Sequence, residues 1–594
     1  MPDTTMHDAR ISAAMMPHPP TGTGDDPHPR PADPRDRRAT RWLRLGLIML
    51  TLVLYGRDWT LSRGAYGDSF HHLINGVFIH DVLIHPRDFL ADPVAFGAQY
   101  YLHYPAVSLG YYMPGFAAIE AVLMLMFGVS AATGQLAVLL CAVLMAVFAF
   151  EWFRLRFGHW WSAGGTVILM SMPQLVYWGR DIMLEIPMMA FVMGAIWMFE
   201  KLARDPRPAW RAAIVWGLLT AAACLIKQNA LMLLGVYFIS TIAMRRWGHL
   251  RFGSIWAGVL ICVVAAALVV AITFALGGDA VGHSVGFTKQ HVLDRFNIDQ
   301  WTYYLRILPK RVGYLTLILA GIGLIGAFQT RDRYVWPSVM WIVCFYVMHS
   351  YFKAQSARYA CLWLPPFCML GLMGLRSVCH GFQHPPGSGR RSARWIGVAM
   401  LMIYASTMLA HTVNLVPYIV SSAYQRAADD LSERLGPFTC MTFFPDRPGR
   451  IAVCYRLAVE ERHRQTGEDI YAFGRILRAK QVLTGWRDRW QTVETVTDKL
   501  KLWNVKFILT ETPRSMDAHA GDTEIHAIMR GIIATGDFQP IRTYQVLLDP
   551  VYRYPKRTLT LYERVGPLDY HPGAIPPVHT GRIPLDMARA AMHQ

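Results

Sequence analysis

Long apolar runs, separated by short polar segments, dominate the chain up to about residue 420. A straight membrane-spanning helix needs about 20 apolar residues, and helices in a large bundle extend into flanking polar residues. We therefore interpret each run as a span, which predicts a polytopic α-helical membrane protein with eleven transmembrane helices. The runs are 43–60, 131–152, 160–178, 182–201, 210–226, 228–245, 254–276, 311–328, 334–350, 358–377 and 394–416.

Arginines and lysines between the runs predict the orientation, because positively charged loops stay in the cytoplasm. Arginines directly precede the first run and place the N-terminus in the cytoplasm, and five further positively charged loops follow. Alternation then places everything after 417 outside. The run 113–128 breaks this alternation. It is short and contains Pro114 and Glu120, so we interpret it as a helix that lies on or dips into the outer leaflet.

The two ends of the chain differ from this middle part. Residues 1–42 lack apolar periodicity and are predicted to form a disordered cytoplasmic tail. Residues 43–420 form the transmembrane domain, with a first outer loop at 61–130 and a second long loop at 277–310.

Residues 421–594 are predicted to form a soluble α/β domain, because short strands alternate with helices there. The strands are predicted at Thr439–Phe444, Val505–Leu509 and Thr558–Tyr562, and a helix at 421–435. Cys440 and Cys454 fall in this domain, and a disulfide between them and two separate thiols both remain open.

Composition narrows the function classes. The chain is 53% hydrophobic and 17% charged, whereas soluble domains carry about 25% charged residues, so a soluble enzyme is excluded. The net charge of +17 comes from arginines between apolar runs. It therefore reflects membrane topology, and we expect no nucleic-acid partner. The nine cysteines show no CxxC pair or Cys/His spacing of a zinc or iron–sulfur site.

Ionisable residues at membrane depth are costly and mark functional candidates. Most of them fall on the predicted outer side, at the ends of spans, which predicts a cavity for a polar substrate rather than a pore. The set comprises Asp68, His71, His72, Asp81, His103, Arg180, Asp181, Glu185, Lys227, Lys353 and Arg358.

Each of the four central candidates also has a purely structural interpretation. Asp68 fits the N-cap of an interfacial helix, and Glu185 fits a solvated helix N-terminus. Lys227 fits a lysine in a surface turn that extends its charged end to water, and Arg358 fits a simple interface anchor.

The order of these motifs resembles that of the GT-C fold glycosyltransferases. An Asp follows the first span, then come Tyr111-Tyr112-Met113-Pro114, Arg180-x4-Glu185-x-Pro187, Lys227 at an outer turn, and Lys353-x4-Arg358-Tyr359. The chain is most similar to the protein O-mannosyltransferase and lipid A aminoarabinose transferase branch, and the resemblance covers about 43–420. Residues 503–509 are similar to the outer α/β domains of some bacterial members.

The resemblance implies roles for individual residues. Asp68 matches the family's first-loop catalytic acid and Glu185 its second acid. Tyr112 and Pro114 occupy the aromatic-Pro-Pro position, and Lys227 and Arg358-Tyr359 match positions near the phosphate of the donor. We count His103 and Arg180 as further substrate-binding candidates. Two departures, Ser69 after Asp68 and Met113 before Pro114, argue against a protein mannosyltransferase in the narrow sense.

The implied reaction transfers a sugar from a polyprenyl-phosphate donor to a lipid, glycan or protein acceptor outside the cytoplasm. A phosphate leaving group is a weak base, so cations suffice to stabilise it, and one carboxylate, Asp68, takes the acceptor's proton with inversion at the sugar. A bacterial inner-membrane location follows from the resemblance. Whether a divalent cation binds in the first loop as a cofactor remains open.

Three other functions compete. A transporter or lipid flippase would explain the spans, but transporters usually show paired repeats and charges near mid-membrane. A scaffold anchored by the bundle would not need eleven spans with charged ends. An O-antigen ligase is a third alternative, and the position of Asp68 directly after the first span argues against it.

Overall fold

The computed structural model describes most of the membrane part and the core of the C-terminal part. The described residues are 34–57, 68–104, 106–285, 297–352, 355–381, 390–413, 423–435, 440–444, 454–458, 470–472, 492–502, 505–511, 520–546 and 557–566. The predicted tail up to residue 33 and the last segment from 567 lie outside this range.

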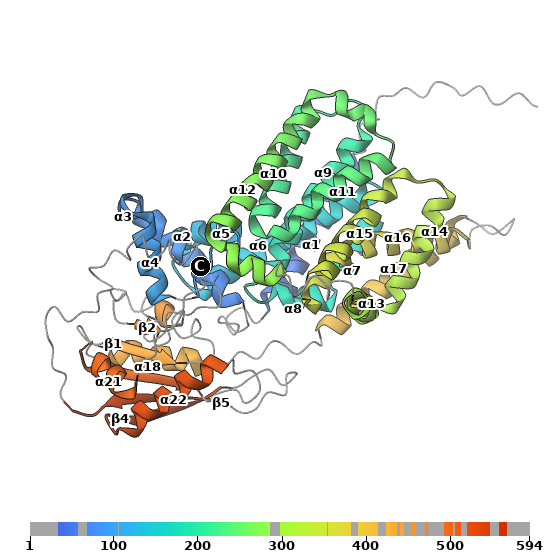
Figure 1. Ribbon diagram of the computed structural model, residues 1–594. Helices are drawn as coiled ribbons and strands as arrows, with labels where there is room; N and C mark the ends of the chain where they lie inside the picture. Colours follow the sequence, from blue (N-terminus) through green and yellow to red (C-terminus); the bar gives the residue numbers. More distant parts are fainter. Residues whose placement is uncertain are drawn as a thin grey trace, which may run out of the picture.

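Helices account for the whole described part up to residue 413 (Figure 1). A first helix leads into four short helices of the first loop, and these into the main bundle. The helices are α1 Pro34–Gly56, α2 Ser69–Ile84, α3 Pro86–Ala91, α4 Pro93–His103, α5 Pro114–Phe127, α6 Ala131–Arg154, α7 His159–Met170, α8 Pro173–Gly179, α9 Glu185–Arg204, α10 Trp210–Ile226, α11 Met232–Ala243, α12 Gly253–Val285, α13 Ile298–Val312, α14 Tyr314–Gln329, α15 Trp336–Tyr351, α16 Leu364–Gly381 and α17 Arg390–Val413.

The predicted polytopic helical membrane fold is confirmed at the level of its class. Among the described residues, five helices are long and apolar enough to cross a membrane, and a sixth arises if α13 and α14, bent by 106°, form one span. This criterion finds fewer than the eleven predicted spans, so the number of eleven stays a prediction. One reason is local: the run 160–178 is divided into α7 and α8, because Pro173 starts a new helix.

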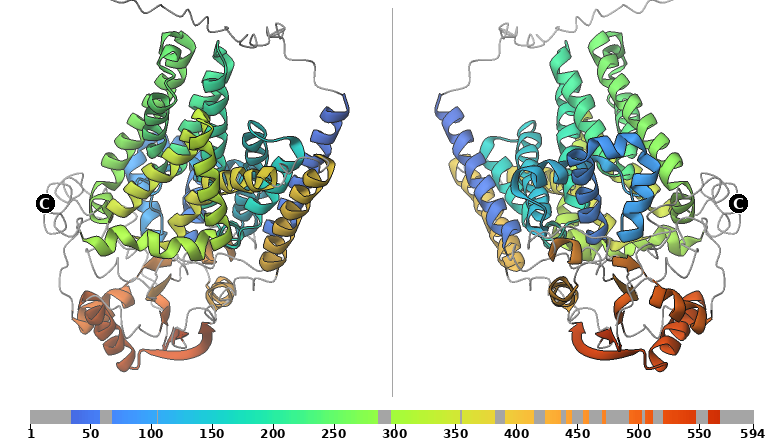
Figure 2. Two further views of the ribbon diagram at one scale, coloured as in Figure 1. Left: turned by 90° about the vertical axis from the view of Figure 1, so that its right-hand side faces the viewer. Right: turned by 90° about the vertical axis from the view of Figure 1, so that its left-hand side faces the viewer.

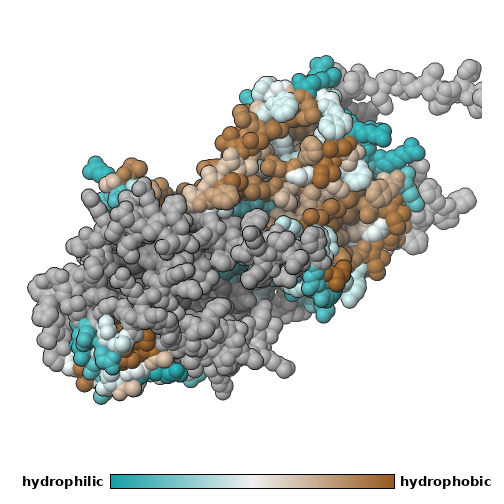
Figure 3. Space-filling view, viewed as in Figure 1, coloured by the Kyte–Doolittle hydropathy of each residue, from teal (hydrophilic) through white to brown (hydrophobic). Residues whose placement is uncertain are grey.

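The outer surface of the bundle is apolar where a bilayer would contact it. Figure 3 shows hydrophobic side chains over the face on which α12 lies. On α12, Leu260 is 62% and Phe274 is 76% exposed. Large exposed apolar faces of this kind mark contact with a partner or a membrane.

Two predicted boundaries need correction. Residues 34–42 belong to α1 rather than to a disordered tail. Arginine is a good helix former, so the helix continues past the apolar run that the hydropathy pattern detects. The loop 277–310 is largely helical, because α12 extends to Val285 and α13 starts at Ile298.

The C-terminal part contains a mixed five-stranded sheet in the order β2-β1-β3-β5-β4. Its strands are β1 Cys440–Phe444, β2 Ile470–Ala472, β3 Val505–Glu511, β4 Phe538–Val546 and β5 Arg557–Arg564. β1 pairs in parallel with β2 and β3, and β5 pairs antiparallel with β3 and β4. The described parts of the predicted strands and of the helix at 421–435, now α18 Ala423–Arg434, are therefore confirmed.

Helices cover the sheet, and its central strand is buried. α21 Val493–Leu502 and α22 Ala520–Ala534 pack through Leu500 and Ile532 against Val505 and Ile508 of β3. α18 packs against β4 and β5. Cys454 is buried, whereas the side chain of Cys440 lies outside the described part, so their pairing stays open.

The C-terminal part adjoins one end of the bundle, next to the first-loop helices (Figure 2). Arg456 donates to Asp81 of α2 at 3.3 Å, and Tyr100 of α4 donates to the same carboxylate at 2.9 Å. Burial alone would raise the pKa of Asp81, but the hydrogen bond with His80 and the charge of Arg456 hold it below its usual range. An ionised Asp81 thus joins the two parts at neutral pH.

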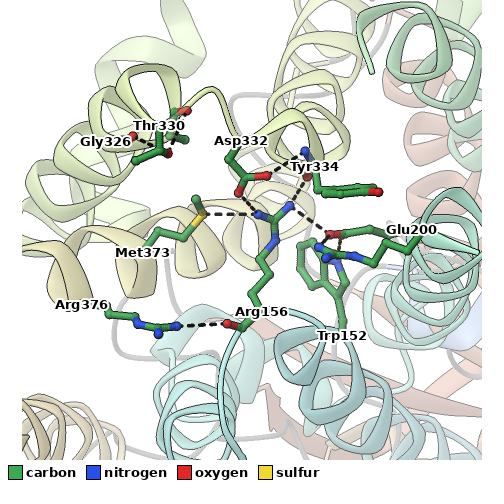
Figure 4. Close-up of polar contacts among 11 residues, drawn as sticks. Trp152, Arg156, Glu200, Gly326, Thr330, Asp332, Tyr334, Met373 and Arg376 are labelled. Atoms are coloured by element: carbon green, nitrogen blue, oxygen red, sulfur yellow. Dashed lines mark hydrogen bonds and ion pairs between the residues drawn. The ribbon is translucent and has the colours of Figure 1, made fainter. Parts of the chain in front are cut away.

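The opposite end of the bundle contains a buried arginine network (Figure 4). Arg156 lies 3.0 Å from Glu200 and 2.6 Å from Asp332, and its side chain is 6% exposed. Trp152 Nε1 donates to Glu200 at 2.9 Å, and Arg376 donates to the carbonyl of Arg156 at 3.1 Å. Four of the predicted positively charged loops, which contain Arg156, Arg204, Asp332 and Arg376, therefore meet at one end.

Replacement of Arg156 by Gln should destabilise the bundle strongly. The substitution removes one of the two cations of the buried Glu200, which keeps Arg204 at 2.6 Å, and also the cation that pairs with Asp332. Breaking a buried ion pair from one side costs about 3–5 kcal/mol. Thermal unfolding in detergent measures this effect. Arg211→Gln, an exposed arginine at the start of α10, is the matched control and should change little. An equal midpoint for both variants would contradict the structural role of Arg156.

Candidate active site

Two carboxylates and two cations form a connected chain of ion pairs at the end of the bundle that adjoins the first loop. Arg358 donates through Nη1 to Asp68 Oδ2, and its Nε lies 3.6 Å from Glu185 Oε1. Lys227 Nζ donates to the same Glu185 oxygen at 2.7 Å. The four residues come from segments up to 290 positions apart. The fold therefore brings together the four central candidates of the sequence.

Helix ends place these side chains at one level. Asp68 directly precedes α2, and Glu185 is the first residue of α9. Lys227 follows α10 in an extended conformation, which ends that helix. Arg358 lies in the 3-10 helix Ala357–Trp363, where Ser356 accepts a hydrogen bond from its backbone N–H.

A glycine allows the first loop to approach this group. A Cβ on Gly115 would lie 2.6 Å from the carbonyl oxygen of Leu225 near the end of α10. Only a residue without a side chain permits this contact. It holds the start of α5, and with it Tyr112 and Pro114, beside the turn that carries Lys227.

The side chains of Asp68, Glu185 and Lys227 do not make the contacts that their purely structural interpretations predict. The carboxylate of Asp68 contacts Arg358 and does not cap α2. Glu185 is 1% exposed, so it is not a solvated helix terminus, and Lys227 is buried against Glu185 rather than extended to water. Buried charges of this kind persist only when they are paired.

Aromatic rings surround the cations. Lys227 Nζ lies 5.1 Å and Arg358 Cζ 5.4 Å from the ring centre of Tyr359. The ring of His349 in α15 stacks on Tyr359 at 5.1 Å with an angle of 18°. Cation–π contacts hold a positive charge in place without neutralising it, so both cations keep their charge for an anionic ligand.

Two first-loop rings line the group beside Asp68. The ring of Tyr112 lies 4.5 Å from that of His72 in an edge-on arrangement. Burial lowers the pKa of His72 to about 3 although Asp68 and Glu185 oppose this, so His72 is neutral at physiological pH. Burial and the charge of Asp68 raise the pKa of Tyr112, so its hydroxyl remains a proton donor.

Three buried polar atoms of this site have no hydrogen-bond partner among the residues that the structure describes. They are Glu185 Oε2, Arg358 Nε and His349 Nδ1. Buried polar atoms are nearly always satisfied in folded proteins. The carboxylate oxygen, the guanidinium nitrogen and the ring nitrogen can therefore each form a hydrogen bond with a polar ligand.

The remaining candidates have other positions. Arg180 donates through Nε to the carbonyl of Leu54 at 3.0 Å and so connects the ends of α8 and α1. Pro114 starts α5 and fixes its first turn. His103 is the last residue of α4, and its side chain lies outside the described part. Lys353 lies outside it as well.

Sequence reasoning assigned no role to His349, Gln228 or Asn229. Gln228 donates to the carbonyl of Tyr111 at 3.1 Å, and Asn229 lies 3.4 Å from His349 Nε2. A lone histidine inside the apolar run 334–350 was the available signal for His349. The two amides directly follow Lys227, and only the fold shows which segments they join.

A model of the family described as dolichyl-phosphate-mannose-protein mannosyltransferase matches residues 112–286. The crystal structure of ArnT from Cupriavidus metallidurans bound to undecaprenyl phosphate has the same fold, with 15% identity and a TM-score of 0.56 over 88% of this chain and 98% of ArnT. The chain therefore has the fold of ArnT, and its residues 112–286 match the mannosyltransferase family. The family resemblance predicted from the sequence is thereby confirmed.

Two structures of the Archaeoglobus fulgidus oligosaccharyltransferase AglB are more distant. The complex with an inhibitory peptide and a dolichol-phosphate is 10% identical, with a TM-score of 0.47 over 79% of this chain and 69% of AglB. The complex with Zn and sulfate is 11% identical, with a TM-score of 0.46 over 79% and 68%. No curated protein matches this chain by sequence.

The described residues do not fit a divalent cation. Within them, no group of three or more His, Cys, Asp and Glu side chains has the arrangement of a metal site. Asp68 and Glu185 instead have Arg358 and Lys227 as counter-ions. The mechanism below therefore contains no step through a metal.

The pair of Asp68 and Arg358 predicts how stability depends on pH. Burial alone would raise the pKa of Asp68, but Arg358 and the nearby histidines hold it well below its usual range. An unfolded Asp has a pKa of about 3.9. The stabilising contribution is therefore fully present above about pH 4 and is lost as the pH falls through the folded-state pKa.

Thermal unfolding of wild type and Asp68→Asn at several pH values measures this contribution. The stability of wild type relative to the variant should be constant between about pH 5 and 8 and should fall at lower pH. Asp88→Asn, an exposed aspartate in α3, is the control. A relative stability that stays flat below about pH 4 would show that Asp68 titrates like an unpaired carboxyl, and one that rises as the pH falls from about 8 to 5 would show a raised rather than a lowered pKa.

Proposed function

We propose that this protein is a glycosyltransferase that moves a sugar from a polyprenyl-phosphate donor to a lipid, glycan or protein acceptor on the extracytoplasmic side. The observation that carries this proposal is the chain of ion pairs Asp68–Arg358–Glu185–Lys227, in which Glu185 and Lys227 are buried and Asp68 and Arg358 are partly buried. It combines cations for a phosphate with a carboxylate for a hydroxyl proton. The undecaprenyl phosphate of the similar ArnT structure and the dolichyl-phosphate-mannose of the family description support this donor class.

The two cations stabilise the leaving group. As the bond between the sugar C1 and the phosphate oxygen breaks, its electron pair goes to that oxygen, and negative charge develops on the phosphate. Arg358 and Lys227 lie in a buried site, where fixed charges stabilise developing charge most effectively. Arg358 offers a planar set of N–H donors that suits a phosphate, and Lys227 acts as a point charge.

Asp68 accepts the proton of the acceptor hydroxyl. The hydroxyl oxygen attacks C1 from the side opposite the phosphate, and its proton passes to the Asp68 carboxylate. One direct displacement of this kind inverts the configuration at C1. Tyr112 and neutral His72 beside Asp68 provide further hydrogen-bonding groups for the sugar or the acceptor.

Donor binding activates the base in this mechanism. Without the donor, Arg358 pairs with Asp68 and keeps its pKa low, which makes Asp68 a weak base. A phosphate competes for the same guanidinium, because Arg–phosphate pairs are strong and bidentate. When Arg358 turns toward the phosphate, Asp68 loses its counter-ion, its pKa rises, and it becomes a stronger base.

Glu185 acts as a positioning residue. It contacts both Lys227 and Arg358 and is almost completely buried. It therefore keeps Lys227 in place while Arg358 changes partners. Its unpartnered Oε2 also offers an acceptor for a hydroxyl of a substrate.

Asp68→Asn should abolish transfer without unfolding the protein. Removal of a general base typically lowers the rate about 10²–10⁴-fold. Purified protein in nanodiscs is offered a panel of polyprenyl-phosphate sugars with an envelope extract as acceptor, and released polyprenyl phosphate is measured. Release from one donor by the wild type alone would identify the sugar. Asp88→Asn should behave like the wild type, and full activity of Asp68→Asn would refute the proposed base.

The pH dependence of the rate tests base activation by the donor. kcat/KM reports pKa values of the free enzyme and kcat those of the enzyme–substrate complex. Because the donor removes Arg358 from Asp68, the acid limb should lie at higher pH in kcat than in kcat/KM. Coincident acid limbs would mean that Arg358 does not leave Asp68 when the donor binds.

A further inference from the structure

A basic pocket of about 450 Å³ lies at the Arg-rich end of the bundle, between the start of α1, the end of α6 and the start of α7. Its lining includes Arg37, Arg41, Arg44 and Arg154, and one acid, Asp36. Figure 2 shows α1 at the edge of the bundle, extending away from the C-terminal sheet. The pocket therefore lies far from the sugar-transfer site.

The spacing of the arginines on α1 builds this pocket. Positions 37, 41 and 44 follow the i, i+4, i+7 pattern, which places three side chains on one face of a helix. That face is turned toward α6 and α7, against which α1 packs. Arg38 belongs to a different face and does not line the pocket.

The pocket carries an excess of positive charge. Arg44 Nε donates to Glu151 at 2.8 Å, and Arg154 donates to the same carboxylate at 3.1 Å. Four arginines thus face two acids, Glu151 and Asp36. In the described part of the chain, no carboxylate lies within ion-pair distance of Arg37 or Arg41. Both side chains are exposed, so water can solvate them, but the excess positive charge of the pocket favours an anion.

The surroundings of the pocket indicate a ligand with an apolar part. Beyond Arg44, α1 turns apolar, and Met49 is 59% exposed on it. Trp42 on α1 and Trp160 on α7 are 64% and 58% exposed. Exposed tryptophans next to arginines are typical of the level of lipid headgroups. If the pocket held the phosphate of a lipid, the acyl chains of that lipid would therefore have room along α1.

We propose that this pocket binds the phosphate of an anionic glycerophospholipid from the leaflet at the Arg-rich end. Basic pockets between membrane helices bind anionic headgroups in this way. The headgroup bridges α1 to α6 and α7 by neutralising Arg37 and Arg41. This site is separate from the donor site and does not depend on the proposed function.

Native mass spectrometry of the full chain in a neutral detergent tests the proposal. Wild type titrated with phosphatidylglycerol should retain one molecule more tightly than phosphatidylcholine. Arg41→Gln should weaken phosphatidylglycerol binding about fivefold, the effect expected for one basic residue. Arg38→Gln removes the same charge from another face of the same helix, so it should bind like the wild type.

Further measurements distinguish a lipid site from a site for a soluble phosphate compound and from a non-specific charged surface. sn-Glycerol 3-phosphate carries the same phosphate without acyl chains, and displacement of the lipid by it at equal concentration would indicate a site for a soluble phosphate compound. If Arg38→Gln weakened binding as much as Arg41→Gln, or if phosphatidylcholine bound as tightly as phosphatidylglycerol, the proposal of a specific phosphate site would be wrong. If Arg41→Gln is unstable, Arg37→Gln in the preceding turn provides the second test, with the same expected loss.

Discussion

The contact of one guanidinium with two carboxylates organises the candidate active site of this protein. Arg358 reaches Asp68 at the entry to the first loop and Glu185 at the start of α9, and Glu185 in turn holds Lys227. None of these charges would be stable alone in a bundle core, because an unpaired buried charge costs several kcal/mol. Mutual pairing makes the group stable without substrate. In the proposed mechanism the same pairing keeps Asp68 a weak base until an anion competes for Arg358, so stability and reactivity would depend on one contact.

The two ends of the bundle use charge differently. At the end far from the C-terminal sheet, Arg156 is held by Glu200, Asp332 and a backbone carbonyl, and its Nε has no partner among the described residues. At the other end, the site keeps unpartnered polar atoms on Glu185, Arg358 and His349. Unpartnered atoms therefore occur at both ends. The end with Asp68 differs in offering an unpartnered carboxylate oxygen and an unpartnered ring nitrogen beside its two cations.

The first loop connects the reactive end to the C-terminal part. Tyr112 and His72 lie beside Asp68, and Asp81, further along the same helix as His72, pairs with Arg456 of the C-terminal part. α2 thus contacts the site at its start and the C-terminal part near its end. An acceptor held by the C-terminal part would approach the site along the first-loop helices, which agrees with the proposed transfer to an outer acceptor.

The sequence by itself determined the class of the fold, three of the five strands of the C-terminal sheet and the four charged residues of the candidate site. Hydropathy runs and residue order are local properties, so Asp68, Glu185, Lys227 and Arg358 were identifiable one by one, each with an equally good structural explanation. Only the tertiary structure chose between these explanations, because a side chain's partner 290 residues away is not encoded locally. The same limit applies to His349, whose role depends on its stacking on Tyr359. Helix ends also depended on packing: α1 begins nine residues before its apolar run, since arginines favour a helix that hydropathy does not detect.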